Sequence, residues 1–280
     1  MKFRTARVNG IELSYAVEGQ GPPLVLIHGL ACGKRMWLWQ VGALRRDFTV
    51  ITYDQRGHGL STAPEDPQDY SSAHLTRDLV GLLDHLAIER CHLLGFSLGG
   101  GPAIAAAISS PDRIARLVLA GVGSGADNVT LIPSVVRRWT SLAAKSGMEE
   151  LPDEMLRSEF FKTYANKSSR DRCHMRALIS ATPQRGLVST LSEVLGKRRS
   201  VFRMDAALKR IRARTLVLRG DQDNVCRASS KLLAASIPGA SYQVMPGAGH
   251  MAPLEVPRLF NSAVHTFLTR ESAPSSPSAR

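Results

Sequence analysis

The sequence predicts an α/β fold with a mostly parallel central sheet, helices on both faces and an inserted helical cap. Short apolar runs that end in glycine alternate with helical stretches, as in parallel strands joined by helices. The alternation stops at residues 126–204 and then resumes, which indicates an insertion between two strands. We therefore expect a core of residues 1–125 and 205–270, a helical cap at 126–204 and a disordered tail at 271–280.

The first half of the chain is predicted to contain a β-hairpin, four strands and two helices. Asn9-Gly10 separates two alternating segments and is typical of a two-residue hairpin turn. Leucines at helical spacing predict the first helix, with an apolar face formed by Leu75, Leu79, Leu82, Leu83 and Leu86. In chain order we expect a hairpin at 4–19, strands at 23–29 and 48–59, a helix at 72–87, a strand at 91–97, a helix at 98–109 and a strand at 114–122.

The second half begins with the cap, whose residues read as several amphipathic helices without a clear strand. Strand signals then return. We expect a strand at 215–223, a helix at 228–237, a strand and loop at 241–250 and a final helix at 257–268. Residues 271–280 are polar and rich in Ser and Pro, which is typical of a disordered segment.

Composition predicts a soluble, cytoplasmic protein with a sizeable core. The chain has 280 residues, of which 44% are hydrophobic and 21% are charged. No apolar run approaches the ~20 residues that span a bilayer, and the N-terminus lacks the apolar segment of a signal peptide. The four cysteines are widely spaced and no His/Glu cluster has metal-ligand spacing, so we expect neither a metal site nor a redox motif.

The net charge of +12 is concentrated in the middle of the chain, where residues 126–214 hold 18 Lys/Arg against 9 Asp/Glu. A basic surface attracts anions. No nucleic-acid-binding motif or aromatic-interleaved basic stripe accompanies the charge, so we expect no nucleic-acid partner. The basic surface is then either a solvated face or part of a site for an anionic ligand.

Residues 121–126 read G-x-G-x-x-A after a predicted strand, like the turn that binds a dinucleotide. The strand–helix–strand unit that this turn requires does not follow. No acidic residue ends a second strand about 20 residues further on, where it would bind the ribose. We therefore expect no nucleotide cofactor.

Ser97 is the predicted nucleophile. Gly95-Phe96-Ser97-Leu98-Gly99 fits G-x-S-x-G and lies where a strand is expected to become a helix. In that setting the serine occupies a sharp turn that exposes its hydroxyl, and the glycines permit close approach of neighbouring elements. The alternative is an ordinary serine that caps the following helix.

A serine hydroxyl needs a base to become an effective nucleophile, and His250 is the predicted base. It lies in PGAGHMAP, directly after the last predicted strand. His28 and His58 also follow strands, but both precede Ser97, which is the wrong chain order for a nucleophile-elbow fold.

The base needs a carboxylate that holds its tautomer and stabilises the imidazolium. LVLRGDQDN supplies Asp221 and Asp223 after a predicted strand, between Ser97 and His250 in the chain. We favour Asp223 as the acid and assign Asp221 to the turn. Asp127, after the preceding strand, is a third option.

Two backbone N–H groups are expected to stabilise a developing oxyanion. One belongs to Leu98, directly after the nucleophile. The other belongs to Leu30, in the loop that follows the strand at 23–29, where Gly29 lets the chain turn close to the site. His28 is expected to be structural.

Taken together, these motifs resemble the α/β-hydrolase fold superfamily. The matching segments are GPPLVLIHGLACGKRMW, YDQRGHGLS, GFSLGGG, LRGDQDN and PGAGHMAPLEVP, and they extend from Gly21 to Pro257 with the cap unmatched. The chain is similar to compact esterases and lactonases such as 3-oxoadipate enol-lactonases, and to cofactor-free haloperoxidase-like esterases. By this resemblance the turn at 54–59 is structural.

The residues and the resemblance predict a serine hydrolase that cleaves a small carboxylic ester or lactone through an acyl-enzyme, without metal or cofactor. An anionic substrate is one option, because arginine binds carboxylates in a bidentate manner. The candidate cap arginines are Arg137, Arg138, Arg172 and Arg176. Two alternatives stay open: a C–C bond hydrolase of meta-cleavage-type products with the same three residues, and a ligand receptor with little turnover. The oligomeric state is left open, and no membrane partner is expected.

Overall fold

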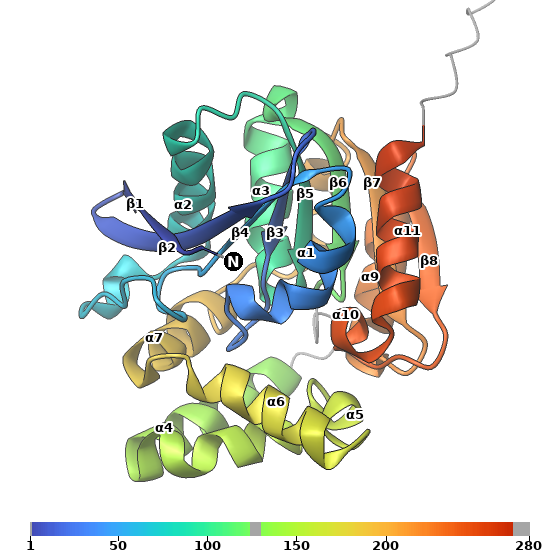
Figure 1. Cartoon of the computed structure of the whole chain (residues 1–280). Coiled ribbons are helices and arrows are strands. Elements are labelled where there is room, and N and C mark those ends of the chain that lie inside the picture. The colour runs from blue at the N-terminus through green and yellow to red at the C-terminus, as the bar shows by residue number, and fades with distance from the viewer. Residues whose placement is uncertain (1, 124–129, 271–280) are drawn as a thin grey trace, which may run out of the picture.

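In the computed structural model, which describes residues 2–123 and 130–270, the strands form one eight-stranded sheet (Figure 1). Its order is β1-β2-β4-β3-β5-β6-β7-β8, with β1 and β2 antiparallel to their neighbours and all other pairs parallel. The predicted fold class is confirmed. The strands are β1 (Arg4–Val8), β2 (Ile11–Glu18), β3 (Pro23–Ile27), β4 (Thr49–Tyr53), β5 (Cys91–Phe96), β6 (Ile114–Ala120), β7 (Arg214–Gly220) and β8 (Ser241–Met245).

Helices cover both faces of the sheet. Successive side chains of each parallel strand point to opposite faces, so each face has its own core. On β3, Leu24 and Leu26 join the cluster under α1 and α11, while Val25 and Ile27 join the cluster under α2, α3 and α9. Continuous apolar strands arise because both faces are buried. These helices are α1 (Leu38–Leu44), α2 (Ser72–His85), α3 (Gly100–Ser109), α9 (Arg227–Ser236), α10 (Ala252–Glu255) and α11 (Pro257–Thr269).

The described part of the segment between β6 and β7 contains several helices and no strand. Figure 1 shows α4 to α7 grouped beneath the sheet, away from the flanking helices. Aromatic side chains hold this helical layer together, with the Trp139 ring 6.1 Å from Phe160 and 6.5 Å from Phe161. The helices are α4 (Leu131–Leu156), α5 (Lys162–Ala165), α6 (Ser169–Ser180), α7 (Gln184–Ser189) and α8 (Asp205–Leu208).

Local details follow the sequence in part. The hairpin turns at Asn9 and Gly10, both with positive φ (46° and 77°). The short helices α1 and α10 were not predicted, since neither is long enough to show a periodic apolar pattern. The strand expected at 215–223 ends at Gly220, which leaves Asp221 and Asp223 in the following loop.

Two of the expectations concern residues outside the described part of the chain: the disordered tail at 271–280, and Asp127 as an acid. Across 2–123 and 130–270, none of the helices is both long enough and apolar enough to cross a membrane.

Candidate active site

The turn at Ser97 is strained. Ser97 follows β5 directly and has φ 50°, which few non-glycine residues adopt. A Cβ atom at Gly95 would lie 2.7 Å from the carbonyl oxygen of Gly99, and one at Gly99 would lie 2.4 Å from the carbonyl oxygen of Ile27. The two glycines are therefore required by close backbone approach on both sides of the serine. A single 3-10 turn at Ser97–Gly99 then leads into α3.

Three residues that are far apart in the sequence meet at this turn. Ser97 Oγ lies 3.0 Å from His250 Nε2, and His250 Nδ1 lies 2.9 Å from Asp223 Oδ2. Both distances are within hydrogen-bonding range. Asp223 is 2% exposed and His250 is 4% exposed, so water competes little for these bonds. The arrangement can remove a proton from the serine hydroxyl and store positive charge on the ring beside a carboxylate.

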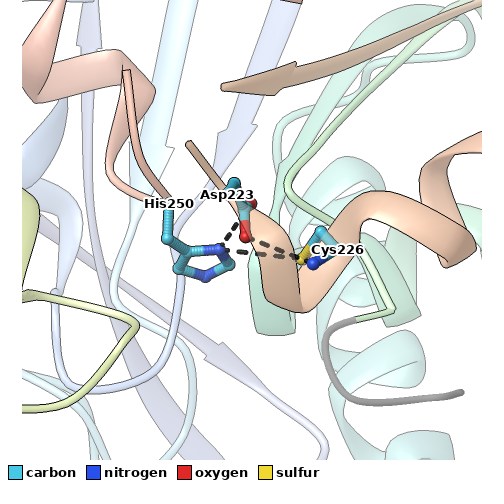
Figure 2. A group of neighbouring side chains, drawn as sticks. All are labelled: Asp223, Cys226 and His250. Carbon is cyan, nitrogen blue, oxygen red and sulfur yellow. Dashed lines mark hydrogen bonds and ion pairs between the residues drawn. The ribbon is translucent and has the colours of Figure 1, made fainter. Parts of the chain in front are cut away.

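Asp223 is held as a carboxylate in spite of its burial. Burial alone would raise its pKa, but the facing charge of His250 and hydrogen bonds from His250 and Cys226 together keep the pKa below its ordinary value. The backbone N–H of Cys226 donates to Asp223 Oδ1 at 3.2 Å. Figure 2 shows that the Cys226 thiol, on the turn that begins α9, also faces the His250 ring; Sγ lies 3.7 Å from Nδ1.

Two other carboxylates fix the loop that carries His250. Asp221 accepts the N–H of Ala248 at 3.1 Å, so it secures the loop and does not face the imidazole. Glu255, at the end of α10, accepts the N–H of Gly249, and burial raises its pKa. Of the two aspartates after β7, the structure therefore places Asp223 against His250.

Leu30 and Leu98, the expected oxyanion-binding positions, lie on the same small cavity as Ser97 and His250. The loop after β3 reaches this place through a sharp turn in which Ala31 has φ 56°. That conformation is uncommon for alanine and indicates a backbone held in place by its surroundings. Nothing in the sequence identified the strain at Ala31, because alanine carries no left-handed preference.

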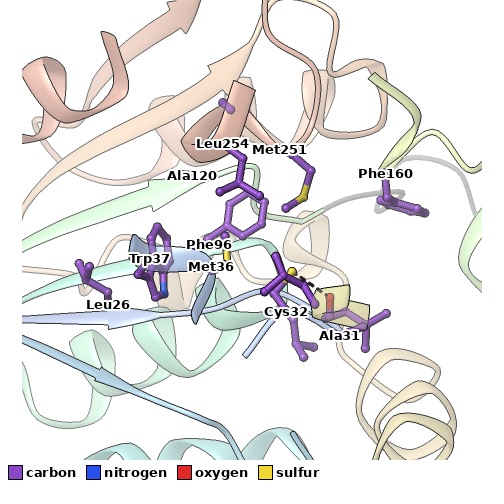
Figure 3. Packing of buried hydrophobic residues seen from close by; sticks show 14 of the residues in the cluster. Leu26, Ala31, Cys32, Met36, Trp37, Phe96, Ala120, Phe160, Met251 and Leu254 are labelled. Carbon is purple, nitrogen blue, oxygen red and sulfur yellow. Dashed lines mark hydrogen bonds between the residues drawn. The ribbon is translucent and has the colours of Figure 1, made fainter. Parts of the chain in front are cut away.

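This small cavity has a volume of about 30 Å³, which exceeds the ~10–15 Å³ that a cavity needs to hold one water molecule. Its walls are mostly aromatic or aliphatic. Figure 3 shows part of the surrounding core, with Phe160 reaching in from the helical layer. The Phe160 ring lies 5.4 Å from His250, and Phe96 lies 5.3 Å from His250 and 6.2 Å from Trp37. The reacting groups thus face a mainly apolar surface.

A second, large cavity of about 350 Å³ also reaches Ser97. This volume lies within the ~300–1,000 Å³ typical of small-molecule sites. Its lining comes from α2, α3, the end of β6 and residues 194–204, and is mainly apolar. The charged members of the described lining are Arg198, which is half-buried, and Arg199, which is exposed. Burial lowers the pKa of Arg198.

The cap arginines suggested by the sequence lie elsewhere. They are Arg137, Arg138, Arg172 and Arg176. Arg138 pairs with Glu154 at 2.6 Å, while Arg172 and Arg176 reach Asp153 at 3.5 and 3.1 Å. None of the four belongs to the described lining of either cavity at Ser97. Counting charges in the sequence could not distinguish these surface arginines from Arg198 and Arg199, which line the large cavity.

His28 and His58 are buried. His28 Nδ1 contacts the carbonyl of Gly29 at 2.7 Å, while its Nε2 accepts the N–H of Gln55 at 2.9 Å. Burial lowers the pKa of His28, and it lowers the pKa of His58 to about 3. Both histidines therefore serve the packing of the loops after β3 and β4.

The glycine turn after β6 also borders the site. A Cβ atom at Gly121, whose φ is 57°, would lie 3.2 Å from His250 Cε1. The first glycine of the dinucleotide-like pattern is thus explained by the approach of the His250 ring. The last residues of that pattern lie outside the described part of the chain.

Comparison with known proteins agrees with this fold. Residues 22–257 match the sequence profile of the alpha/beta hydrolase fold. A provisionally named carbamate hydrolase, RutD, of Variovorax paradoxus is 30% identical over 271 residues, which cover 95% of this chain and 99% of that protein. The 2-hydroxymuconate semialdehyde hydrolase of a Pseudomonas species is 30% identical, covering 94% and 93%. The enol-lactonase of Burkholderia xenovorans has a TM-score of 0.84 at 31% identity, covering 95% and 100%.

Proposed function

The chain belongs to the alpha/beta hydrolase fold family. We propose that this hydrolase cleaves a small carboxylic ester or lactone through an acyl-enzyme on Ser97. The observation that carries the proposal is the continuous contact from Ser97 Oγ to His250 Nε2 and from His250 Nδ1 to Asp223 Oδ2, at 3.0 and 2.9 Å. A nucleophile, a base and an orienting carboxylate in this order are the requirements for acyl transfer to serine.

In the first half of the reaction, Ser97 Oγ attacks the carbonyl carbon while His250 takes its proton. Asp223 holds the ring in the tautomer whose Nε2 faces the serine, and then stabilises the imidazolium. The negative charge that develops on the carbonyl oxygen is stabilised by the N–H groups of Leu98 and Leu30. His250 returns its proton to the leaving oxygen, and the acyl group stays on Ser97.

In the second half, one water molecule attacks the acyl-enzyme. The small cavity of about 30 Å³ beside Ser97 and His250 is the proposed seat of this water. His250 removes a proton from the water, the oxyanion forms again between Leu30 and Leu98, and the acid leaves as Ser97 regains its proton. Phe160 lies over the ring from the helical layer, and we assign residues 126–204 the role of a cap that excludes bulk water.

Substrates with a carboxylate fit the large cavity best. Arg198 and Arg199 are the charged side chains of its described lining, and the rest of that lining is mainly apolar. A guanidinium group binds a carboxylate through two parallel hydrogen bonds. A substrate with an apolar body and one anionic end therefore matches the cavity in both charge and size.

The same three residues also serve a second candidate reaction, the hydrolysis of a C–C bond in meta-cleavage-type products. The observation that favours it is the 30% identity to the 2-hydroxymuconate semialdehyde hydrolase. Relative kcat/KM for a meta-cleavage product and for an ester or lactone of similar size separates the two reactions. A preference for the C–C substrate by more than about 1.4 kcal/mol, or tenfold, reverses the assignment.

Labelling with a fluorophosphonate tests the proposal directly. Intact mass should show one adduct on the native protein and none on Ser97→Ala. In parallel, p-nitrophenyl acetate should give a burst of p-nitrophenol followed by turnover, both lost in the variant. An adduct without turnover on any ester, lactone or C–C substrate would identify a ligand receptor. Absence of an adduct would contradict an activated serine.

A further inference from the structure

The Asp223–His250 pair has a third neighbour whose chemistry the hydrolase reaction does not use. Cys226 is completely buried, and its thiol faces the same edge of the imidazole as the carboxylate (Figure 2). The Sγ of Cys226, the Nδ1 of His250 and a carboxylate oxygen of Asp223 all lie within 4.8 Å of one another. A thiolate, an imidazole nitrogen and a carboxylate oxygen are the three ligand types that proteins offer to zinc.

The separations are close to those of a tetrahedral zinc site. Zinc lies ~2.3 Å from sulfur and ~2.0–2.2 Å from nitrogen or oxygen, which corresponds to N···S and N···O separations of about 3.5 and 3.3 Å. The observed values are 3.7 Å from Nδ1 to Sγ and 2.9 Å from Nδ1 to Oδ2. Shifts of a few tenths of an ångström bring Nδ1 to these separations from Sγ and from Oδ2, and Sγ lies within 4.8 Å of the carboxylate oxygen.

The charges also balance. A divalent cation bound by one thiolate, one carboxylate and one neutral imidazole has no net charge, which limits the penalty for burying it. Binding releases the proton on Sγ to solvent and moves the ring proton from Nδ1 to Nε2, so the imidazole stays neutral. Three other charged groups among the described residues interact with the cluster. The guanidinium of Arg198 interacts with Cys226, Glu255 interacts with His250, and Arg219 donates to the backbone carbonyl of Asp223 at 3.0 Å.

We propose that Asp223, Cys226 and His250 bind a thiophilic divalent cation such as Zn²⁺, and that the bound cation silences the hydrolase. With Nδ1 bound to the metal, the neutral imidazole carries its proton on Nε2, the atom that faces Ser97 Oγ. His250 then cannot accept the serine proton. Silencing rests on the proposed function, whereas binding of the cation does not.

Binding is measured by titration with Cd²⁺, which gives an ultraviolet charge-transfer band when it is bound by a thiolate. The native protein should develop the band at one equivalent, and Ser97→Ala should keep it, because the nucleophile is not a ligand. Cys226→Ser and Cys226→Ala should both lose it. Two substitutions are used so that a folding defect in one, seen by circular dichroism, leaves the other as the test.

Silencing is measured by the rate of fluorophosphonate labelling with and without Zn²⁺, each variant being compared with its own metal-free rate. Zn²⁺ at ~10 times its Kd should slow labelling of the native protein about tenfold, and should not slow labelling of the Cys226 variants. The matched control is Cys173→Ser, which removes an exposed thiol on α6 and should leave the inhibition intact.

The outcomes separate the alternatives. A band that depends on Cys173 would place the cation at the surface of α6 and overturn the proposal. Inhibition that survives in both Cys226 variants would indicate a cation on Nε2 of His250, and would also overturn it. A normal Cd²⁺ band in a protein that does not label at Ser97 would leave the metal site standing and contradict the proposed function instead.

Discussion

His250 Nε2 lies 3.0 Å from Ser97 Oγ, although the two residues are 153 positions apart in the chain. The contact exists because β5 and β8 end on the same side of a parallel sheet, and because Gly121 has no side chain where the His250 ring approaches.

Replacing Asp223 with Asn should lower kcat by about 10⁴-fold, because an amide holds His250 in the wrong tautomer and does not stabilise the imidazolium. The matched control is Asp221→Asn, two residues away. Its amide oxygen can still accept the N–H of Ala248, so kcat should fall by no more than a few-fold. Steady-state hydrolysis of p-nitrophenyl acetate by both variants decides the matter. Equal losses in the two variants would contradict the assignment of Asp223 as the acid.

Gly99→Ala should destabilise the protein by about 1–3 kcal/mol, because the new Cβ would lie 2.4 Å from the carbonyl oxygen of Ile27. Gly101→Ala is the control, two positions further along in α3. A Cβ atom at Gly101 would have no other atom within 4 Å, and alanine in place of glycine in a helix should add about 0.5–1 kcal/mol to the free energy of unfolding. Urea unfolding measures both free energies. If Gly99→Ala matched the native protein, close backbone approach would not be the reason for this glycine.

The free energy of unfolding should fall as the pH drops below about 6.5, partly because of His58. The pKa of His58 is lowered to about 3 in the fold, so between these values the unfolded chain binds the extra proton. The contribution of His58 to the free energy of unfolding is fully present above the pKa of the unfolded chain and is lost on acidification. The free energy of unfolding should change by up to about 1.4 kcal/mol per pH unit from this residue. His58→Gln should remove this part of the slope in urea unfolding at pH 7, 6 and 5. Parallel curves for variant and native protein would contradict it.

Arg198→Gln or Arg199→Gln should lower kcat/KM for an anionic ester by about ten- to a hundredfold, the usual range for a lost hydrogen bond to a charged group. Mono-p-nitrophenyl glutarate and neutral p-nitrophenyl valerate form a matched pair of similar length. The valerate should lose little in either variant. Arg176→Gln, whose native side chain pairs with Asp153 on the surface, should affect neither ester. If the native protein had no higher kcat/KM for the glutarate than for the valerate, the proposal of a carboxylate subsite would be wrong.

Much of the fold could be read from the sequence because its signals are local. Apolar runs before glycine marked the parallel strands, and Asn9-Gly10 marked the hairpin. Ser97, Asp223 and His250 were selected because the loops after parallel strands meet at one edge of the sheet. Residue type and order along the chain then restrict the candidates for nucleophile, acid and base. Their meeting in space was a consequence of topology.

Other features of the site depend on contacts that no local pattern encodes. Cys226 is one of four widely spaced cysteines in the sequence, and only the turn at Asn224–Cys226 brings its thiol to the His250 ring. Arg198 and Arg199 were two of many basic residues in a basic segment. An arginine in this segment lines a cavity or pairs with a surface carboxylate according to how the helices pack. The sequence predicted these helices only as a group and did not show their packing.

The opening of two cavities onto Ser97 has a consequence for the choice of acceptor. In the proposed reaction the alcohol that leaves and the acceptor that attacks occupy the same place, and the cavity of about 350 Å³ that reaches Ser97 is wide enough for an alcohol. Added ethanol should therefore compete with water for the acyl-enzyme, and chromatography of the products should show ethyl ester beside the acid. A hydrolase of this shape is also a transacylase whenever an alcohol is plentiful.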